Sequence, residues 1–157
     1  MENLLKKAIQ LRNEQKFVQS REILLGLTNF TQDPEVLYQC AWTHDAMGME
    51  TEASLYYERA IEQGLEGESL RGAYIGLGST YRCVGEYDKA IAVLEAGIER
   101  YPDDDVMKVF LSLAKYNVQS HEEAMKLLLD VAMKTESVKT YAKAITFYKE
   151  RLNEIFK

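Results

Sequence analysis

A small residue recurs along this chain of 157 residues at nearly constant spacing. Ser20, Ala53, Ala90 and Ala124 are separated by 33, 37 and 34 residues. A fixed period of this length is typical of repeat architectures, in which each unit buries its apolar face against its neighbours. The spacing therefore predicts about four similar structural units.

The third unit carries the most complete pattern around its small residue. The pattern reads Tyr74-x2-Leu77-Gly78-x2-Tyr81, then Gly85-x-Tyr87-x2-Ala90-x3-Leu94, and ends with Pro102. It predicts two antiparallel helices of about a dozen residues each, since Gly78 and Ala90 are small enough for two helices to touch there. Gly85 permits a tight turn between the helices, and Pro102 ends the second one.

This pattern resembles the tetratricopeptide repeat, whose signature places an aromatic residue, Leu-Gly, Tyr, Ala, a bulky residue and a terminal Pro at these offsets. Three positions depart from it mildly: Tyr74 replaces a Trp, Leu94 replaces an aromatic residue, and Gly97 replaces a second Ala. The resemblance implies an all-α fold, a right-handed superhelix (α-solenoid) of four antiparallel helix-turn-helix repeats. A further helix would cap the C-terminal end.

The repeat frame predicts a single domain over residues 1–157. Its repeats are expected at approximately 1–33, 34–67, 71–104 and 105–136, followed by a C-terminal helix at 137–157. The longer step of 37 residues is expected to lengthen the loop that begins at Gly64. Asp33-Pro34 and Ser120-x-x-Glu123 are helix-start signals, the second of them a capping box. The first repeat matches the pattern least, as a terminal cap does.

An apolar stripe with alternating steps of three and four residues marks the last helix, expected at about 138–155. It comprises Val138, Tyr141, Ile145, Tyr148, Leu152 and Ile155. One interpretation is a helix that covers the open end of the solenoid. The other is a dimer interface, formed by the candidate residues Tyr141, Ile145, Phe147, Tyr148 and Leu152. Phe147 lies off the stripe and would be exposed if the stripe packed inward.

The resemblance also implies a concave surface lined by the first helix of each repeat. The positions expected to point into it are Leu5, Ile9 and Arg12 in repeat one, Tyr38, Trp42 and Asp45 in repeat two, Ile75, Ser79 and Arg82 in repeat three, and Val109, Leu113 and Tyr116 in repeat four. Trp, Tyr and Arg dominate the energetics of many protein interfaces. We therefore predict a groove for a peptide or protein segment, the alternative being that neighbouring helices bury some of these residues.

Asp45 and Arg82 occupy equivalent places on adjacent first helices. They are expected either to form an ion pair or to contact a partner directly. Some family members grip the C-terminal carboxylate of chaperones with Lys, Asn and Arg. The matching positions here are Leu5, Ile9, Gln39, Gly72 and Gly76, so a chaperone carboxylate clamp is not expected.

Composition narrows the range of partners and compartments. The net charge is −6, and basic residues are scattered among acidic ones, so neither nucleic acid nor an anionic membrane is an expected partner. The first ten residues lack a signal-peptide core, and no apolar run reaches the roughly 18 residues of a membrane span. The sequence thus predicts a cytoplasmic protein, and two cysteines do not make a disulfide framework.

No arrangement of residues in the sequence predicts catalysis, a metal site or a cofactor. The segment His121-Glu-Glu-Ala-Met125 begins like a zinc-protease helix but lacks its second His. Gly76-x-Gly78 has no preceding strand, as a nucleotide-binding turn would require. Cys40 and Cys83 have no activating base nearby in sequence, and Cys40 and His44 are expected in the core.

Two functions remain open at this point. The first is a protein–protein interaction scaffold that binds a segment on its concave face. The second is a homodimeric structural protein, because the segments Ala41–Gly48 and Leu77–Arg82 resemble those of short bacterial family members thought to act as dimers.

Overall fold

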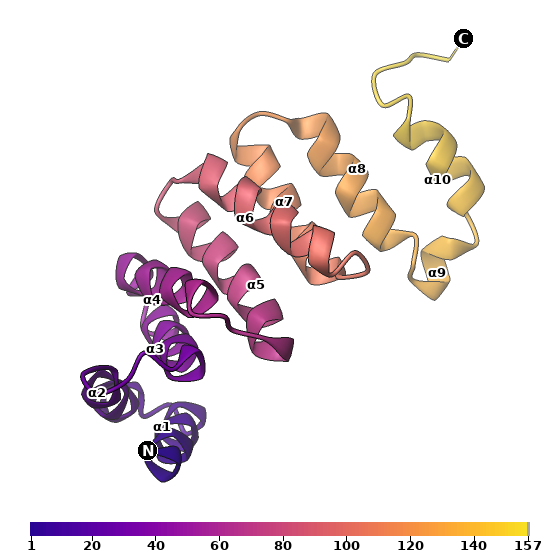
Figure 1. Ribbon diagram of the computed structural model, residues 1–157. Coiled ribbons are helices and arrows are strands. Elements are labelled where there is room, and N and C mark those ends of the chain that lie inside the picture. Colours follow the sequence, from indigo (N-terminus) through magenta and orange to yellow (C-terminus); the bar gives the residue numbers. More distant parts are fainter. Residues whose placement is uncertain (157) are drawn as a thin grey trace. The chain divides into compact units, whose positions relative to one another are not determined.

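The computed structural model describes residues 1–156, and every regular element among them is a helix (Figure 1). The chain divides into two compact units, Met1–Glu86 and Tyr87–Lys157.

The first unit consists of five helices. Helices α1 (Glu2–Asn13) and α2 (Phe17–Thr28) form one hairpin, and α3 (Pro34–Ala46) and α4 (Glu50–Glu62) form the next. The longer helix α5 (Gly67–Cys83) packs against both α4 and α3. Figure 1 shows these helices following one another from indigo to magenta, as expected for stacked repeats.

The second unit continues the same helical pattern. Helices α6 (Tyr87–Arg100), α7 (Asp105–Asn117) and α8 (His121–Ala132) pack in sequence order. Two short helices follow, α9 (Glu136–Lys139) and α10 (Ala142–Lys149), and α10 contacts α8. Helix α6 ends at Arg100, two residues before Pro102, as predicted.

The recurring small residues lie in the core. Ser20, Ala53, Ala90 and Ala124 are all buried, which confirms the sequence interpretation of these positions. Ser20 can stand in place of Ala because its hydroxyl donates a hydrogen bond of 2.8 Å to the carbonyl of Ala8. The polar atom is thereby satisfied inside the core.

Each small residue is preceded, five positions earlier, by a residue in the left-handed backbone region. Gly48 and Gly85 have φ values of 70° and 82°, which glycine adopts without steric cost. Gln15 and Gln119 occupy the same place in the first and fourth repeats, with φ values of 62° and 64°. The turn geometry is therefore shared by all four repeats, although only two of them have glycine there.

The extra residues between the second and third repeats lengthen a helix and not a loop, contrary to the expectation. Helix α4 ends at Glu62, Gly64 follows its C-cap with φ 85°, and α5 begins at Gly67. Leu65 and Leu70 are both buried, so the chain turns inward over a short link. The following residues then extend the first helix of the third repeat to 17 residues.

The prediction of one continuous last helix over about 138–155 is wrong. The chain forms α9, leaves the helix at Thr140 and Tyr141, and forms α10 only as far as Lys149. Val138, Thr140 and Tyr141 are weak helix formers, because their side chains lose rotamer freedom in a helix. Few stabilising contacts offset this weakness, since none of the residues in either short helix is buried.

Of the two predicted helix-start signals, one forms the expected capping hydrogen bonds and the other does not. Asp33 caps α3, its carboxylate accepting hydrogen bonds from the backbone N–H groups of Glu35 and Val36 at 2.9 and 3.3 Å. Ser120 occupies the N-cap position of α8, but its side chain makes no capping hydrogen bond. Glu123 forms an ion pair with Lys115 at 2.9 Å, so the expected capping box is replaced by a charge contact between α7 and α8.

Within residues 1–156, none of the helices combines the length and apolar character that crossing a bilayer requires.

Candidate protein-binding site

A pocket of about 230 Å³ opens on the first unit, and four predicted groove residues line it. Tyr38, Trp42 and Asp45 come from α3, and Ile75 comes from α5. The remaining lining residues are Tyr57 of α4 and Gly72 and Gly76 of α5. These seven residues are called the aromatic pocket below. Residues that the repeat register assigns to two adjacent first helices therefore lie together in one pocket.

Two glycines on one face of α5 make room for the aromatic rings. A Cβ atom at Gly72 would overlap the hydroxyl group of Tyr38, and one at Gly76 would overlap the ring of Tyr57. Because residues four apart share a helix face, the two glycines form a groove into which Tyr38 and Tyr57 fit. This role was not predicted from the sequence, although Gly72 and Gly76 inside a helix were a usable signal, because glycine has a low helix propensity.

The aromatic side chains are held in place by one another and by Arg12. The ring centroids of Tyr38 and Trp42 are 6.0 Å apart, and those of Tyr38 and Tyr57 are 6.1 Å apart. The guanidinium carbon of Arg12 lies 3.7 Å from the centroid of the Trp42 ring, a cation–π geometry. Trp42 nevertheless remains 44% exposed, so a large aromatic surface is both fixed and accessible.

Arg12 is a buried cation, and its neighbours stabilise its charge. Its guanidinium donates a hydrogen bond to the side-chain oxygen of Gln39, whose amide in turn donates to Glu35 at 2.6 Å. Burial lowers the pKa of Arg12, while the nearby Tyr38, Tyr57 and Glu35 act in the opposite direction. Arg12 thus serves to position Trp42 from α1.

Asp45 is the acidic group of the aromatic pocket. Its carboxylate accepts a hydrogen bond of 3.2 Å from the hydroxyl of Tyr57. Burial raises the pKa of Asp45, an effect opposite to that of the ion pair expected with Arg82. Glu50 is a neighbouring carboxyl group, and its pKa is raised by burial and by the charge of Asp45.

Burial differs among the predicted groove residues. Tyr38 is only 8% exposed, so it forms the wall of the pocket more than an open contact surface. Ser79 and Arg82 lie further along α5, outside the residues that line the pocket. Val109, Leu113 and Tyr116 lie on α7 in the second unit, and Leu113 and Tyr116 are exposed.

The two residues expected in the core are there. Cys40 and His44 are buried, and burial raises the pKa of the Cys40 thiol to about 12. Such a thiol is protonated at neutral pH and is a poor nucleophile. Among the described residues, no group of three His, Cys, Asp or Glu side chains is placed to hold a metal ion.

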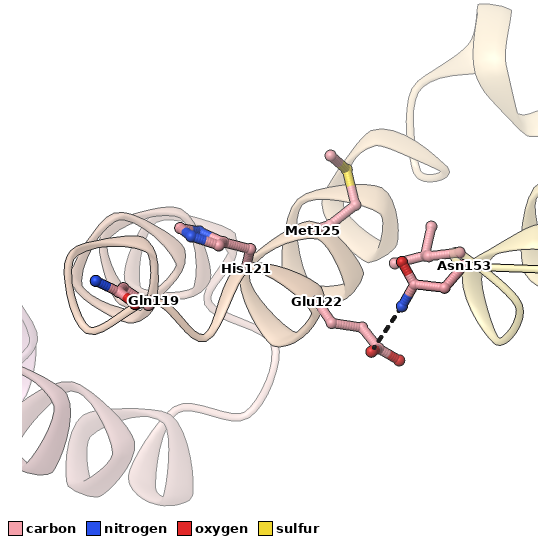
Figure 2. A pocket seen from close by; sticks show the side chains of 6 residues that line it. Gln119, His121, Glu122, Met125 and Asn153 are labelled. Carbon is pink, nitrogen blue, oxygen red and sulfur yellow. Dashed lines mark hydrogen bonds between the residues drawn. The ribbon is translucent and has the colours of Figure 1, made fainter.

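A second, open pocket of about 390 Å³ lies beside the start of α8 (Figure 2). It is lined by Gln119, His121, Glu122, Met125, Leu152 and Asn153. Figure 2 shows the amide of Asn153 reaching Glu122, to which it donates a hydrogen bond of 3.5 Å. His121 is exposed at the helix start, as predicted, with its ring 4.9 Å from that of Tyr116.

The C-terminal candidate residues form a small exposed aromatic group. Phe147 contacts the rings of Tyr148 and Phe156 at centroid distances of 5.5 and 5.7 Å. The guanidinium of Arg151 lies 4.2 Å from the Phe147 ring. Tyr141, Phe147, Tyr148 and Leu152 are all exposed, whereas Ile145 is half-buried.

Comparisons with known proteins agree with this architecture. A family model described as Tetratrico peptide repeat matches residues 34–152, while no curated protein matches the sequence. A crystal structure of MamA protein superposes with a TM-score of 0.74 at 21% identity, covering 99% of this chain and 78% of that one. A MamA structure from Desulfovibrio magneticus RS-1 gives a TM-score of 0.73 at 18% identity, covering 95% and 85%. These likenesses show the fold, an all-α solenoid of helical repeats. Because the family model covers most of the sequence, the chain belongs to the tetratricopeptide-repeat family.

Proposed function

We propose that this chain is a protein–protein interaction scaffold that binds a peptide or protein segment on the concave face expected for its family. Tetratricopeptide-repeat proteins are in general non-enzymatic interaction modules. The observation that carries the proposal is Trp42, which is 44% exposed yet fixed by Arg12 and Tyr38. Rigid, accessible aromatic groups are the usual anchors of protein interfaces.

The binding surface is centred on the aromatic pocket in this proposal. Ser79 and Arg82 extend this surface along α5 within the first unit, and Val109, Leu113 and Tyr116 on α7 are candidate contact residues of the second unit. The dispersed basic residues and the net charge of −6 favour a protein over a nucleic acid or a membrane surface as partner. We place the interaction in the cytoplasm.

Affinity purification from the native host, followed by mass spectrometry, tests the proposal. The full chain and its Trp42→Ala variant serve as baits, and Phe30→Ala is the matched control because Phe30 is 90% exposed and lies outside the aromatic pocket. We expect partners captured by the full chain to be lost with Trp42→Ala and kept with Phe30→Ala.

Circular dichroism separates loss of binding from loss of folding, because Trp42→Ala also removes the ring that faces the buried Arg12. A variant with unchanged helicity that captures the same partners as the full chain would show that the groove proposal is wrong. Arg82→Glu tests the extension of the surface along α5 in the same way.

Self-association is the second candidate function, and the C-terminal aromatic group favours it. Phe147, Tyr148 and Phe156 form ring contacts with one another while remaining exposed. Clustered exposed aromatic side chains mark interaction surfaces more often than single ones do. In this alternative the chain is a homodimeric structural protein, with Tyr141, Ile145 and Leu152 completing the interface.

A further inference from the structure

The aromatic pocket is sized for a single side chain. Its volume of about 230 Å³ lies below the roughly 300–1,000 Å³ of pockets that hold whole small molecules. Three helices contribute to its walls, and the two glycines of α5 let the rings of Tyr38 and Tyr57 lie directly against the backbone of that helix. One projecting side chain of an extended segment is therefore the occupant that fits.

The walls of the pocket suit an apolar stem that carries a positive charge. Trp42, Tyr38 and Tyr57 present aromatic surface, whose π-faces attract cations. The guanidinium of Arg12 covers part of the Trp42 ring at 3.7 Å, so the surface available to a ligand is the 44% of this side chain that remains exposed. Ile75 adds an aliphatic contact, which suits the methylene stem of a long basic side chain.

Asp45 supplies the complementary charge. Its side chain is half-buried, lines the pocket, and lies against Glu50, which is also half-buried. One oxygen of Glu50 is buried without a hydrogen-bond partner among the described residues. Two neighbouring carboxyl groups in a partly dry environment repel each other, and a cation brought to them relieves this repulsion.

Within residues 1–156, the two arginines whose charges act on Tyr38, Arg12 and Arg71, have other partners. Arg12 is stacked on Trp42 and donates its hydrogen bond to Gln39. Arg71 forms an ion pair with Glu68 at 3.8 Å. Burial raises the pKa of Asp45, whereas a closely placed cation would lower it.

We propose that the aromatic pocket binds the side chain of a lysine or arginine in an extended partner segment, with Asp45 as its counter-ion and Trp42 as its aromatic wall. This inference rests on the proposed function and names the chemistry that the groove selects. It predicts a partner with a basic side chain flanked by apolar or small residues.

Short peptides that differ in a single charge test this proposal. The probes are the acetylated and amidated pentapeptide Ala-Ala-Lys-Ala-Ala and its analogue with norleucine, a neutral residue of similar length, in place of lysine. Trp42 is the only tryptophan in the chain, so its fluorescence and its single indole N–H signal in NMR report on this pocket alone. We expect the lysine peptide to perturb both signals and to bind at least about tenfold more tightly than the norleucine peptide, because a hydrogen bond to a charged group contributes that much.

The variant Asp45→Asn removes the charge and keeps an oxygen that can accept the hydrogen bond from Tyr57. It should reduce the affinity for the lysine peptide to that for the norleucine peptide and leave the latter unchanged. Glu50→Gln, which preserves Asp45, should cause a smaller loss of affinity. Equal affinities of the two peptides for the full chain, or an unchanged lysine preference in Asp45→Asn, would overturn the inference.

The two proposals can fail separately. If partner capture depends on Trp42 but the lysine preference does not depend on Asp45, the groove binds a segment of another chemistry, and only this inference is wrong. If neither the peptides nor the captured partners depend on Trp42, the groove proposal itself is wrong.

Discussion

Hydrogen bonds at both ring nitrogens keep His44 as a neutral imidazole. Nδ1 donates a hydrogen bond of 2.7 Å to the carbonyl oxygen of Cys40, and Nε2 accepts one of 3.1 Å from Arg21. Burial of the ring, with a smaller contribution from the charge of Arg21, lowers the pKa of His44. A protonated His44 would have a second donor pointing at a guanidinium, which explains the direction of the shift.

Acidification is therefore expected to destabilise the fold through His44. The unfolded chain takes up a proton at about pH 6.5, but the folded chain does so only at lower pH. The unfolded state consequently binds more protons between these two values, and the free energy of unfolding falls by up to about 1.4 kcal/mol per pH unit as the pH decreases. Urea unfolding between pH 7.5 and 5 measures this slope.

The other histidine provides the control for this prediction. His44→Gln should flatten the slope, whereas His121→Gln should leave it unchanged, because His121 is exposed at the start of α8. Equal slopes in the two variants would contradict the assignment of the pH dependence to His44.

Single residues were predictable where the repeat pattern fixes their environment. Cys40 and His44 fall at core positions of the pattern, and both are buried. Gly72 and Gly76 were not predicted, because their role depends on where the rings of Tyr38 and Tyr57 lie, and those rings belong to other helices. Spacing along one helix carries no information about a contact of this kind.

Glycine has opposite effects in two helices of the first unit. An added Cβ at Gly26 of α2 would meet nothing within 4 Å, whereas one at Gly76 of α5 would overlap the Tyr57 ring. Tyr57 is 3% exposed and its hydroxyl is bound to Asp45, so the ring has little freedom to move aside.

Alanine should therefore stabilise one helix and destabilise the other. Gly26→Ala is expected to raise the free energy of unfolding by about 0.5–1 kcal/mol, since Ala is the better helix former. Gly76→Ala gains the same propensity but incurs an overpacking cost of about 1–3 kcal/mol, for a net loss of up to about 2 kcal/mol. Urea unfolding of both variants checks the signs, and equal stabilisation by both would show that α5 does not pack tightly on Tyr57.

At the level of helices, the sequence predicted where helices begin and end better than whether a long helix is continuous. Asp33 and Pro102 act locally, through a side-chain cap and a steric restriction, and the helices begin and end accordingly. The last helix was predicted from an apolar stripe alone. A stripe stabilises a helix only when another surface buries it, and the residues of α9 and α10 are not buried.

For the molecule as a whole, the exposed C-terminal aromatic group predicts concentration-dependent self-association. Light scattering should give a mass near twice 18.0 kDa at high protein concentration if this group forms a dimer interface. Phe147→Glu should return the mass to that of one chain, because a charge would be buried in the interface.

Leu55→Glu is the matched control for the dimer prediction, since Leu55 is 55% exposed on α4. It should leave the mass of the assembly unchanged. A mass of 18.0 kDa for the full chain at every concentration would contradict self-association and leave the scaffold function as the remaining candidate.

The fold class could be predicted from the sequence because the same structural pattern occurs several times along a repeat protein. The repeat period follows from the positions of Ser20, Ala53, Ala90 and Ala124. The third repeat matches the pattern most completely, and its register could be transferred to the repeats that match less well. The binding pocket was only partly predictable. Its α3 and α5 residues follow from the register, but its depth depends on packing between helices that the register does not describe.

The turns of the four repeats imply an order in which the hairpins open. Gln15 and Gln119 hold the left-handed conformation in the first and fourth repeats, which costs a residue with a side chain about 1 kcal/mol, whereas Gly48 adopts it freely. In repeat proteins, local differences of this kind change the opening of individual hairpins. The α1–α2 and α7–α8 hairpins should therefore unfold locally more often than the α3–α4 hairpin. The aromatic pocket takes Tyr38, Trp42 and Tyr57 from the α3–α4 hairpin, so its aromatic surface is preorganised before a partner binds.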